Sequence, residues 1–290
     1  MPDSGKLIKQ KRLQLNFDRY QRYKICSDFV HAIRSGGEVF SVLEVGSGGL
    51  QELALFLPED RIIFLDKSFP PQLAGKPGFV TGNATNLPFR NEAFDLVVSI
   101  DVYEHIPVPE RFVYLRELLR CARRMVVLAA PFADGLVIAY EKLCHEYYKA
   151  LHGKEHPWLK EHQENGLPDL RQATAFFSRQ GCGVETVPNG YLPHWLILQI
   201  PYFLLLKNPS LSDLFVQLNA FYNQHCYPAD NREPAYRKVL LVCKEQDDLS
   251  LVTDAKRQIL SPGLVPDCRE AAEATLRYLV DSFWFLSMQR

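Results

Sequence analysis

Short, continuously apolar segments alternate with helical segments along residues 41–132, and this alternation limits the possible folds more than any other feature of the chain. The segments "VLEV", "RIIFLD", "GFVTGN", "FDLVVSI" and "RMVVLAAPF" are typical of strands. Strands that are apolar on both faces belong to a parallel sheet that helices cover on both sides. The pattern therefore predicts an α/β fold with a doubly wound, mostly parallel sheet, whose ligands bind beyond the carboxyl ends of the strands.

Composition excludes several classes of function. The chain has 33 basic and 34 acidic residues, and this near-balance disfavours nucleic acid as the main partner. None of its seven cysteines forms a C-x-x-C pair, which disfavours a disulfide framework or a zinc ribbon and favours a reducing cytosol. The first 20 residues lack the apolar run of a signal peptide, so we expect a cytoplasmic protein.

Two apolar segments lie outside the predicted strands. The segment "YLPHWLILQIPYFLLL", residues 191–206, is shorter than the roughly 20 residues that a membrane span needs, so we expect it to be buried or interfacial. Near the end of the chain an apolar stripe has helical spacing, which predicts a helix that docks on the domain or on the partner subunit of a homodimer. The stripe consists of Ala272, Leu276, Leu279, Phe283 and Leu286.

A glycine-rich loop follows the first strand. Gly46 and Gly48 begin a G-x-G-x-x-G pattern, but Gln51 stands where the third glycine would fall, so the loop alone is a weak signal. Asp66 ends the next strand, 20 positions beyond Gly46, where a carboxylate can accept both hydroxyls of a ribose. Glu44 lies inside the first strand, and a buried carboxylate there is expected to organise the loop or to reach a cationic ligand.

With these motifs the chain resembles the class I S-adenosylmethionine-dependent methyltransferases, specifically the type 11 methyltransferase domain. The resemblance covers residues 40–132 and continues more loosely to the last strand near residue 243. Four pieces carry it in order: "VLEVGSGG", "FLDKS", "GNATNLPFRNEAFDLVVSIDVYEHIP" and "LRELLRCARRMVVLAAPF". The third is the most specific, because a nicotinamide-dependent dehydrogenase, the rival class of enzyme, has no reason to carry it.

The resemblance implies S-adenosyl-L-methionine as cofactor. The residues it places around the cofactor are Glu44, Gly46, Ser47, Gly48, Asp66, Lys67, Asn83, Ala84, Ser99 and Asp101. Asp66 matches the acid that binds the ribose, and Lys67 flanks the adenine. Asn83 stands where the family usually has aspartate, and Leu50 where it usually has its last glycine.

The resemblance also implies the organisation of the chain as a Rossmann-like methyltransferase fold with a seven-stranded sheet. We expect an N-terminal helical cap over residues 1–40 and the cofactor-binding half over 41–132. Residues 133–245 complete the sheet and carry helical insertions on the substrate side, and residues 246–290 form a C-terminal helical extension.

The acceptor side is less defined by sequence. The resemblance places His105 at the mouth of the site, where it either serves as a general base or only packs the turn. Insertions at 133–182 and 189–236 are expected to form the acceptor pocket. The candidate substrate-binding residues are His145, Tyr148, His162, Trp195, Tyr222 and His225. We expect no metal site among the clustered histidines, because only His152 and His156 could share a helical face.

The expected function is methyl transfer to a small molecule, through oxygen, with a sugar or a lipid-linked glycan as the first candidate. The segments "HPWLKEHQENGLPDL" and "NGYLPHWLI" are similar to methyltransferases encoded with bacterial surface-polysaccharide enzymes. A lipid-linked acceptor would bring peripheral contact with the inner face of the membrane. The alternatives are a quinone-like or phenolic acceptor, or an inactive regulator that binds the cofactor on the same fold.

Overall fold

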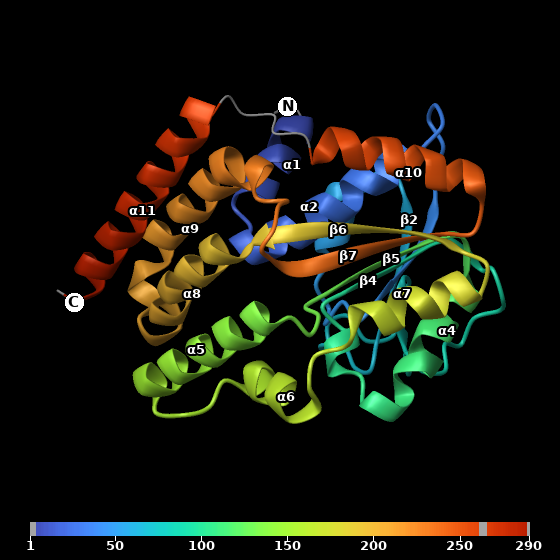
Figure 1. The fold of residues 1–290 in the computed structure, drawn as a ribbon, viewed down its shortest axis with the longest axis horizontal. Coiled ribbons are helices and arrows are strands. Elements are labelled where there is room, and N and C mark those ends of the chain that lie inside the picture. The colour runs from blue at the N-terminus through green and yellow to red at the C-terminus, as the bar shows by residue number, and fades with distance from the viewer. Residues whose placement is uncertain (1–3, 261–265, 289–290) are drawn as a thin grey trace.

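The computed structural model describes residues 4–260 and 266–288, and within them seven strands form one sheet (Figure 1). The strands are β1 (Ser41–Val45), β2 (Arg61–Asp66), β3 (Phe79–Thr81), β4 (Phe94–Ile100), β5 (Ala122–Ala130), β6 (Gly183–Tyr191) and β7 (Ala235–Cys243). Their order is β3-β2-β1-β4-β5-β7-β6, and β7 runs antiparallel to both of its neighbours. This confirms the predicted doubly wound, mostly parallel sheet of the Rossmann-like methyltransferase fold.

The centre of the sheet is buried on both faces, as the apolar strand sequences predict. Every residue of β4 is buried, and β4 pairs in parallel with β1 on one side and with β5 on the other. Neighbouring residues of β5 point to opposite faces. Val127 belongs to one apolar cluster together with Phe29, whereas Val126 belongs to a second cluster together with Leu118. The sheet therefore separates two hydrophobic cores.

Helices cover both faces of the sheet in the two outer layers that Figure 1 shows above and below the strands. On one side lie α2 (Phe17–Ala32), α3 (Glu52–Phe56) and α10 (Gln246–Ile259), and on the other lie α4 (Arg111–Cys121) and α7 (Leu170–Arg179). A short helix, α1 (Ser4–Leu13), precedes α2, which begins where the Asn16 side chain accepts a hydrogen bond from the Asp18 amide. Such a cap satisfies a backbone donor that the first helical turn leaves open.

The two insertions form a helical region at one end of the sheet. The first contains α5 (Gly135–His152) and α6 (Pro157–Asn165), and the second contains α8 (Leu192–Lys207) and α9 (Ser212–Phe221). We call these four helices the insertion helices. α11 (Pro266–Met288) lies against α8 and α9 (Figure 1).

The two apolar segments outside the strands are both helical. The segment 191–206 forms α8, whose Leu198 and Phe203 are buried, and none of the helices in the described ranges is both long and apolar enough to cross a membrane. In α11, Leu276 of the predicted stripe is buried and Leu279 is partly buried against the core. The side chains of Ala272, Phe283 and Leu286 lie outside the described residues.

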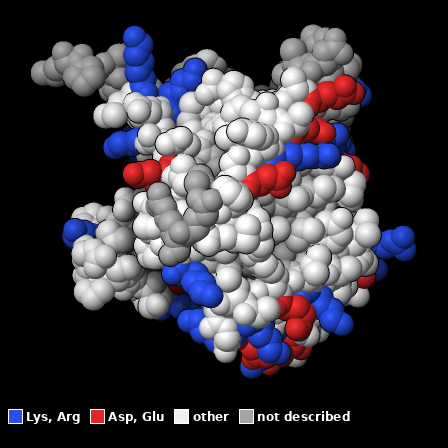
Figure 2. All heavy atoms as spheres, turned by 90° about the vertical axis from the view of Figure 1, so that its left-hand side faces the viewer, with Lys and Arg blue, Asp and Glu red and all other residues white. Residues whose placement is uncertain are grey.

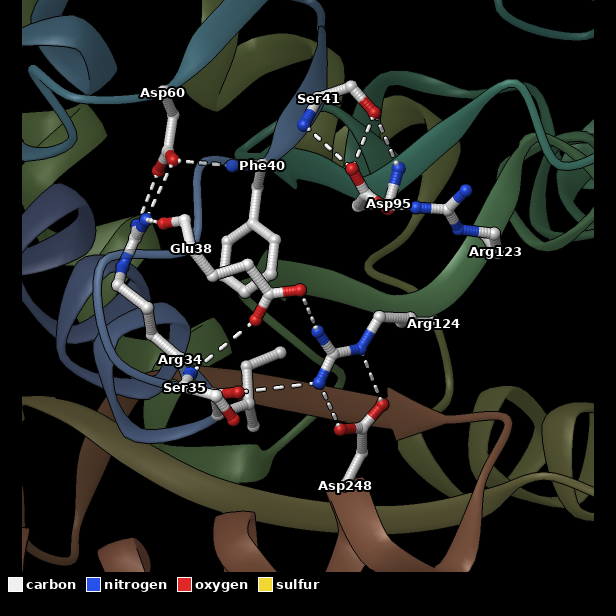
Figure 3. A network of polar contacts seen from close by, with 11 residues as sticks. Arg34, Ser35, Glu38, Phe40, Ser41, Asp60, Asp95, Arg123, Arg124 and Asp248 are labelled. Atoms are coloured by element: carbon white, nitrogen blue, oxygen red, sulfur yellow. Dashed lines mark hydrogen bonds and ion pairs between the residues drawn. The ribbon is translucent and has the colours of Figure 1, made fainter.

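Charged side chains at the amino ends of the strands are paired with one another (Figure 3). Arg34 donates to both carboxylate oxygens of Asp60, at 2.9 and 2.6 Å. Arg124, from β5, donates to Glu38 at 3.0 Å and to Asp248 of α10 at 2.6 Å. This network ties α2 and α10 to the sheet at the edge opposite the glycine loop.

Candidate active site at the carboxyl ends of the strands

The glycine loop after β1 holds a conformation that depends on glycine. Gly46 has φ of +85°, and a Cβ atom there would lie 2.2 Å from Cγ2 of Val102, the residue that follows Asp101. Its N–H donates to the Leu65 carbonyl of β2 at 2.8 Å. Gly46 therefore lets the backbone pass between β2 and the segment that follows β4, where a side chain would clash.

The two predicted acids of the loop have different surroundings. Glu44 is 1% exposed and accepts a hydrogen bond from the Tyr23 hydroxyl at 2.8 Å, while its Oε2 atom has no partner. Burial raises the pKa of Glu44 to about 8, although the Tyr23 hydrogen bond opposes this shift. Asp66, at the end of β2, accepts from the Gly48 amide at 2.7 Å. Asp66 therefore holds the glycine loop and remains open to solvent.

Four other residues that the resemblance places at the cofactor lie along the same edge of the sheet or just below it. Lys67 follows β2 and is exposed. Asn83 follows β3, and its Oδ1 accepts from the Thr85 amide at 3.0 Å, while the neighbouring Ala84 is buried. Ser99 of β4 is fully buried and its hydroxyl contacts the hydroxyl of Tyr114 in α4, so it faces the helix layer.

Asp101, directly after β4, lies in a buried cluster of arginines. Its carboxylate accepts from Nη1 of Arg22 in α2 at 2.6 Å and from Nε of Arg237 in β7 at 2.7 Å. Burial favours the neutral acid, but the two guanidinium groups outweigh it and lower the pKa of Asp101 to about 2. Arg237 also donates to Asp18. The positive φ of Asp101, +52°, turns the chain into this cluster.

A cavity of about 300 Å³ lies among the glycine loop, α2, β7 and the insertion helices. Its lining includes Gly46, Ser47, Gly48, Asp101, His105, His162 and Trp195, all of which were predicted to be site residues. Sequence reasoning missed other parts of the wall. These are Asn16, Asp18, Arg19, Arg22, Tyr23, Glu104, Gln199, Tyr202, Tyr236 and Arg237. His156, Trp158 and Phe203, which also line the cavity, belong to the two insertions that were expected to form the acceptor pocket. An arginine at the start of the apolar strand "YRKVLLVCK" was the one available signal for Arg237.

Two histidines of the wall, His105 and His162, are held by carboxylates. Nδ1 of His105 lies 2.9 Å from Glu161, and Nδ1 of His162 lies 2.9 Å from Glu141. Burial, followed by the neighbouring His162, lowers the pKa of His105 although Glu161 opposes the shift. His105 is therefore neutral near pH 7, as a proton acceptor must be.

The other residues predicted for the acceptor differ in position. Tyr148 of α5 stacks on His152 and contacts His156, which lines the cavity. His145 and Tyr222 are buried, and His225 is exposed; none of the three lines the cavity. Tyr222 instead donates to Asp230 at 2.6 Å.

Comparison with known proteins is consistent with this geometry. Residues 43–130 match the family described as "Methyltransferase domain". Norajmaline N-methyltransferase of Rauvolfia serpentina is 35% identical over 68 residues, which cover 23% of this chain and 20% of the plant enzyme, so the match spans about a fifth of that relative.

Solved structures of methyltransferases are also similar. A SAM-dependent methyltransferase from Thermotoga maritima has a TM-score of 0.48 at 14% identity, over 79% of this chain and 92% of that one. The 1,6-didemethyltoxoflavin-N1-methyltransferase of Burkholderia thailandensis, solved with bound S-adenosylhomocysteine, has a TM-score of 0.34 at 22% identity, over 39% and 54%.

The sheet order with its antiparallel β7, the glycine loop after β1 and the acid at the end of β2 are those of the class I S-adenosylmethionine-dependent methyltransferase fold. The family match identifies residues 43–130 of this chain as a methyltransferase domain.

Polar groups at this edge of the sheet suit the cofactor of this class, whose methionine end carries an ammonium and a carboxylate. Among the described residues, Oε2 of Glu44 and Nη1 of Arg237 are both buried without a hydrogen-bond partner, one in an acid that burial keeps neutral and the other in a charged donor. Buried polar atoms without partners are uncommon in folded proteins, and a bound ligand is one way to satisfy them.

Proposed function

We propose that this protein transfers a methyl group from S-adenosylmethionine to an oxygen of a small-molecule acceptor, with a sugar or a lipid-linked glycan as the preferred class. The observation that carries the proposal is a cavity that joins the glycine loop to the insertion helices. A transferase needs its two ligands in contact, and this cavity has a cofactor-side wall and a separate aromatic wall.

On the cofactor side, we propose that Asp66 binds the ribose and that Glu44, Asp101 and the paired arginines surround the methionine end. When bound, S-adenosylmethionine supplies a methyl group on a positively charged sulfur that is already a good leaving group. The protein then mainly aligns the acceptor, and alignment alone can lower a barrier by several kcal/mol, up to roughly 7–11 in favourable cases.

On the acceptor side, His105 is the candidate general base. Its Nδ1 is held by Glu161, so the ring presents Nε2 as the second nitrogen. In this role Nε2 takes the proton of the acceptor hydroxyl. Glu161 is a positioning residue in this role. Its carboxylate fixes the His105 ring and its tautomer and takes no part in the transfer of the proton or the methyl group.

Aromatic side chains favour an acceptor with a broad apolar face. Trp195 stacks on Tyr236 with ring centroids 3.7 Å apart, and Trp158, Tyr202 and Phe203 complete this wall. Ring faces attract the weakly positive C–H groups of a sugar, and they also stack on planar rings. A phenolic or quinone-like acceptor is therefore the second candidate.

We also propose peripheral contact with a membrane, as a lipid-linked acceptor would require. Leu143 of α5, Leu206 of α8 and Phe285 of α11 are 57, 47 and 57% exposed. Figure 2 shows this side of the molecule, where broad uncharged areas lie between the charged side chains. Exposed apolar surface of this kind marks either a membrane contact or a protein interface, such as a homodimer.

The test is a screen for transfer of a labelled methyl group from S-adenosylmethionine. The acceptors are sugar nucleotides, lipid-linked glycans, phenols and, because the Rauvolfia relative is an N-methyltransferase, small amines. We expect label in a sugar or glycan, with one S-adenosylhomocysteine formed for each product. Label in nucleic acid alone would contradict the proposal, and cofactor binding without any turnover would favour the inactive regulator.

A further inference from the structure

Three potential metal ligands meet in the wall of the cavity. Glu104 and His105 belong to a short helical turn after β4, at Tyr103–His105, and His162 belongs to α6. One ligand atom from each lies within 4.8 Å of the other two. The imidazole rings of the two histidines have their centroids 4.9 Å apart. The fold thus brings together residues that are 58 positions apart in sequence, which explains why histidine spacing alone did not indicate a site.

Each histidine of this cluster is oriented by a carboxylate that is hydrogen-bonded to its Nδ1. Glu161 holds Nδ1 of His105, and Glu141 holds Nδ1 of His162, both at 2.9 Å. Glu141 is itself fixed by the Tyr236 hydroxyl at 2.8 Å. Metal-binding histidines almost always donate their other N–H to a carboxylate or carbonyl, because this bond sets the tautomer and raises ligand basicity.

Two of the remaining ligand atoms are buried without partners. Within the part of the chain that the structure describes, Oε2 of Glu104 and Nε2 of His162 make no hydrogen bond, although the residues are only 1 and 6% exposed. A buried polar atom without a hydrogen-bond partner destabilises the folded state. The neighbouring Asp101 is not a partner for these atoms, because its carboxylate accepts hydrogen bonds from Arg22 and Arg237. A cation between the three side chains would satisfy both atoms.

We propose that Glu104, His105 and His162 bind a divalent first-row transition metal ion such as Zn²⁺. Two imidazoles and one carboxylate are the protein ligands of several catalytic zinc sites, which keep a further position open. Zinc bonds of about 2.0–2.2 Å place ligand atoms roughly 3.5 Å apart, so the cluster closes by about 1 Å when the ion binds. The open position faces the cavity that these residues line.

This inference rests on the proposed methyl transfer for its role, and it replaces His105 as the base in that transfer. An ion in the cavity wall would bind an oxygen of the acceptor and lower the pKa of that hydroxyl. His105 would then be a ligand, and the proton would leave to solvent instead of to its ring. The preferred acceptors are molecules that present an oxygen donor to the metal, such as a sugar with adjacent hydroxyls or a catechol.

The experiment is a titration of the tag-free full-length chain with Zn²⁺ alone, after treatment with a chelator, in competition with a chromogenic zinc indicator. We expect one ion per chain. Glu104→Gln, which keeps the shape of the side chain, and His162→Gln are each expected to weaken binding at least tenfold. The matched control is His145→Gln, a buried histidine outside the cluster, which should bind Zn²⁺ like the wild type.

Two further measurements distinguish loss of the metal site from misfolding or loss of the cofactor site. Replacement of Zn²⁺ by Co²⁺ should produce a visible absorption band that Glu104→Gln alters. Calorimetry with S-adenosylhomocysteine, without metal, checks that each variant is folded and retains its cofactor site. Absence of Zn²⁺ binding in the wild type, or equal binding in wild type and Glu104→Gln, would overturn the inference while normal S-adenosylhomocysteine binding leaves the proposed function intact. Zinc binding without methyl transfer would support the site and count against the proposed function.

Discussion

Glu44 is an acid inside a buried strand, and its protonation makes the free energy of unfolding depend on pH. Burial raises its pKa from 4.5 to about 8, so the folded protein holds a proton that the unfolded chain releases. A raised pKa contributes stability that is complete below pH 4.5 and is lost as the pH rises towards 8. The cofactor-free protein is therefore expected to lose stability through this group between those values.

Glu44→Gln tests this linkage, because the amide oxygen can still accept the Tyr23 hydrogen bond. The free energy of unfolding of the variant should rise relative to wild type by roughly 1.4 kcal/mol per pH unit in that range. Urea denaturation at several pH values between 5 and 9 measures the difference, and contributions of other groups cancel in it. A difference that does not change with pH would show that Glu44 is ionised in the folded protein.

Asp66 supports a prediction about the cofactor. Asp66→Ala removes the carboxylate proposed for the ribose and the acceptor of the Gly48 amide. Calorimetry should show S-adenosylhomocysteine binding weakened at least tenfold, about 1.4 kcal/mol. Asp247→Ala, at an exposed residue of α10, is the control and should bind normally. Unchanged affinity in Asp66→Ala would remove this residue from the site.

Residues near the glycine loop were predictable from sequence, because a strand, a tight turn and an acid follow one another along the chain. Gly46, Gly48 and Asp101 all line the cavity. Glu104 and Glu161 were not predicted, because their chemistry depends on partners from another element. Spacing along one helix cannot report that Glu161 holds His105, since these residues are brought together only by the packing of α6 on the turn after β4.

Among the elements, the helix α2 and the strand β7 are joined through Asp101. Its carboxylate forms ion pairs with Arg22 of the helix and Arg237 of the strand, and Arg237 forms a second ion pair with Asp18 of the helix. The sequence predicted both elements but not their contact, since nothing local in a helix or a strand specifies its partner. The region predicted as an N-terminal helical cap, residues 1–40, contains two helices, α1 and α2, and the break between them sets Asn16 and Asp18 at the cavity.

Arg237→Met should destabilise the protein strongly. The side chain is 1% exposed, and its loss leaves Asp18 without this partner and Asp101 with Arg22 alone. Removing one member of a buried ion pair costs about 3–5 kcal/mol, mostly because a charge stays buried without compensation. Chemical denaturation measures this loss. Arg90→Met, at an exposed position, should change stability by no more than about 0.5 kcal/mol, and an equally small effect of Arg237→Met would contradict the role given to the cluster.

At the scale of the whole molecule, the sheet and its two helix layers follow from the pattern of apolar strands. The arrangement of the insertion helices does not. α8 shows the reason, because its sequence is apolar around most of its surface and gives no single buried face. The residues from Leu192 to Phe203 are buried or half-buried, and α8 contacts several elements at once.

The exposed apolar side chains on the insertion helices predict reversible binding to vesicles that contain anionic bacterial lipids. In a flotation assay, the double variant Leu143→Asp, Leu206→Asp should lose this binding, because charged side chains do not enter the membrane interface. The matched control is Val39→Asp. Val39 is 48% exposed, close to the value for Leu206, but it lies at the opposite end of the sheet. A wild type that never floats, but forms a dimer that the double variant breaks, would assign this surface to a second copy of the chain.

In the proposed function, cofactor and acceptor meet in the cavity between the glycine loop and the insertion helices. A crystal structure of the protein with S-adenosylhomocysteine would show whether they do. We expect the ribose beside Asp66, the methionine end between Gly46 and Asp101, and the sulfur facing the wall that holds His105. Density for the ligand at another place, or across the cavity with its sulfur turned away from His105, would rule out this arrangement.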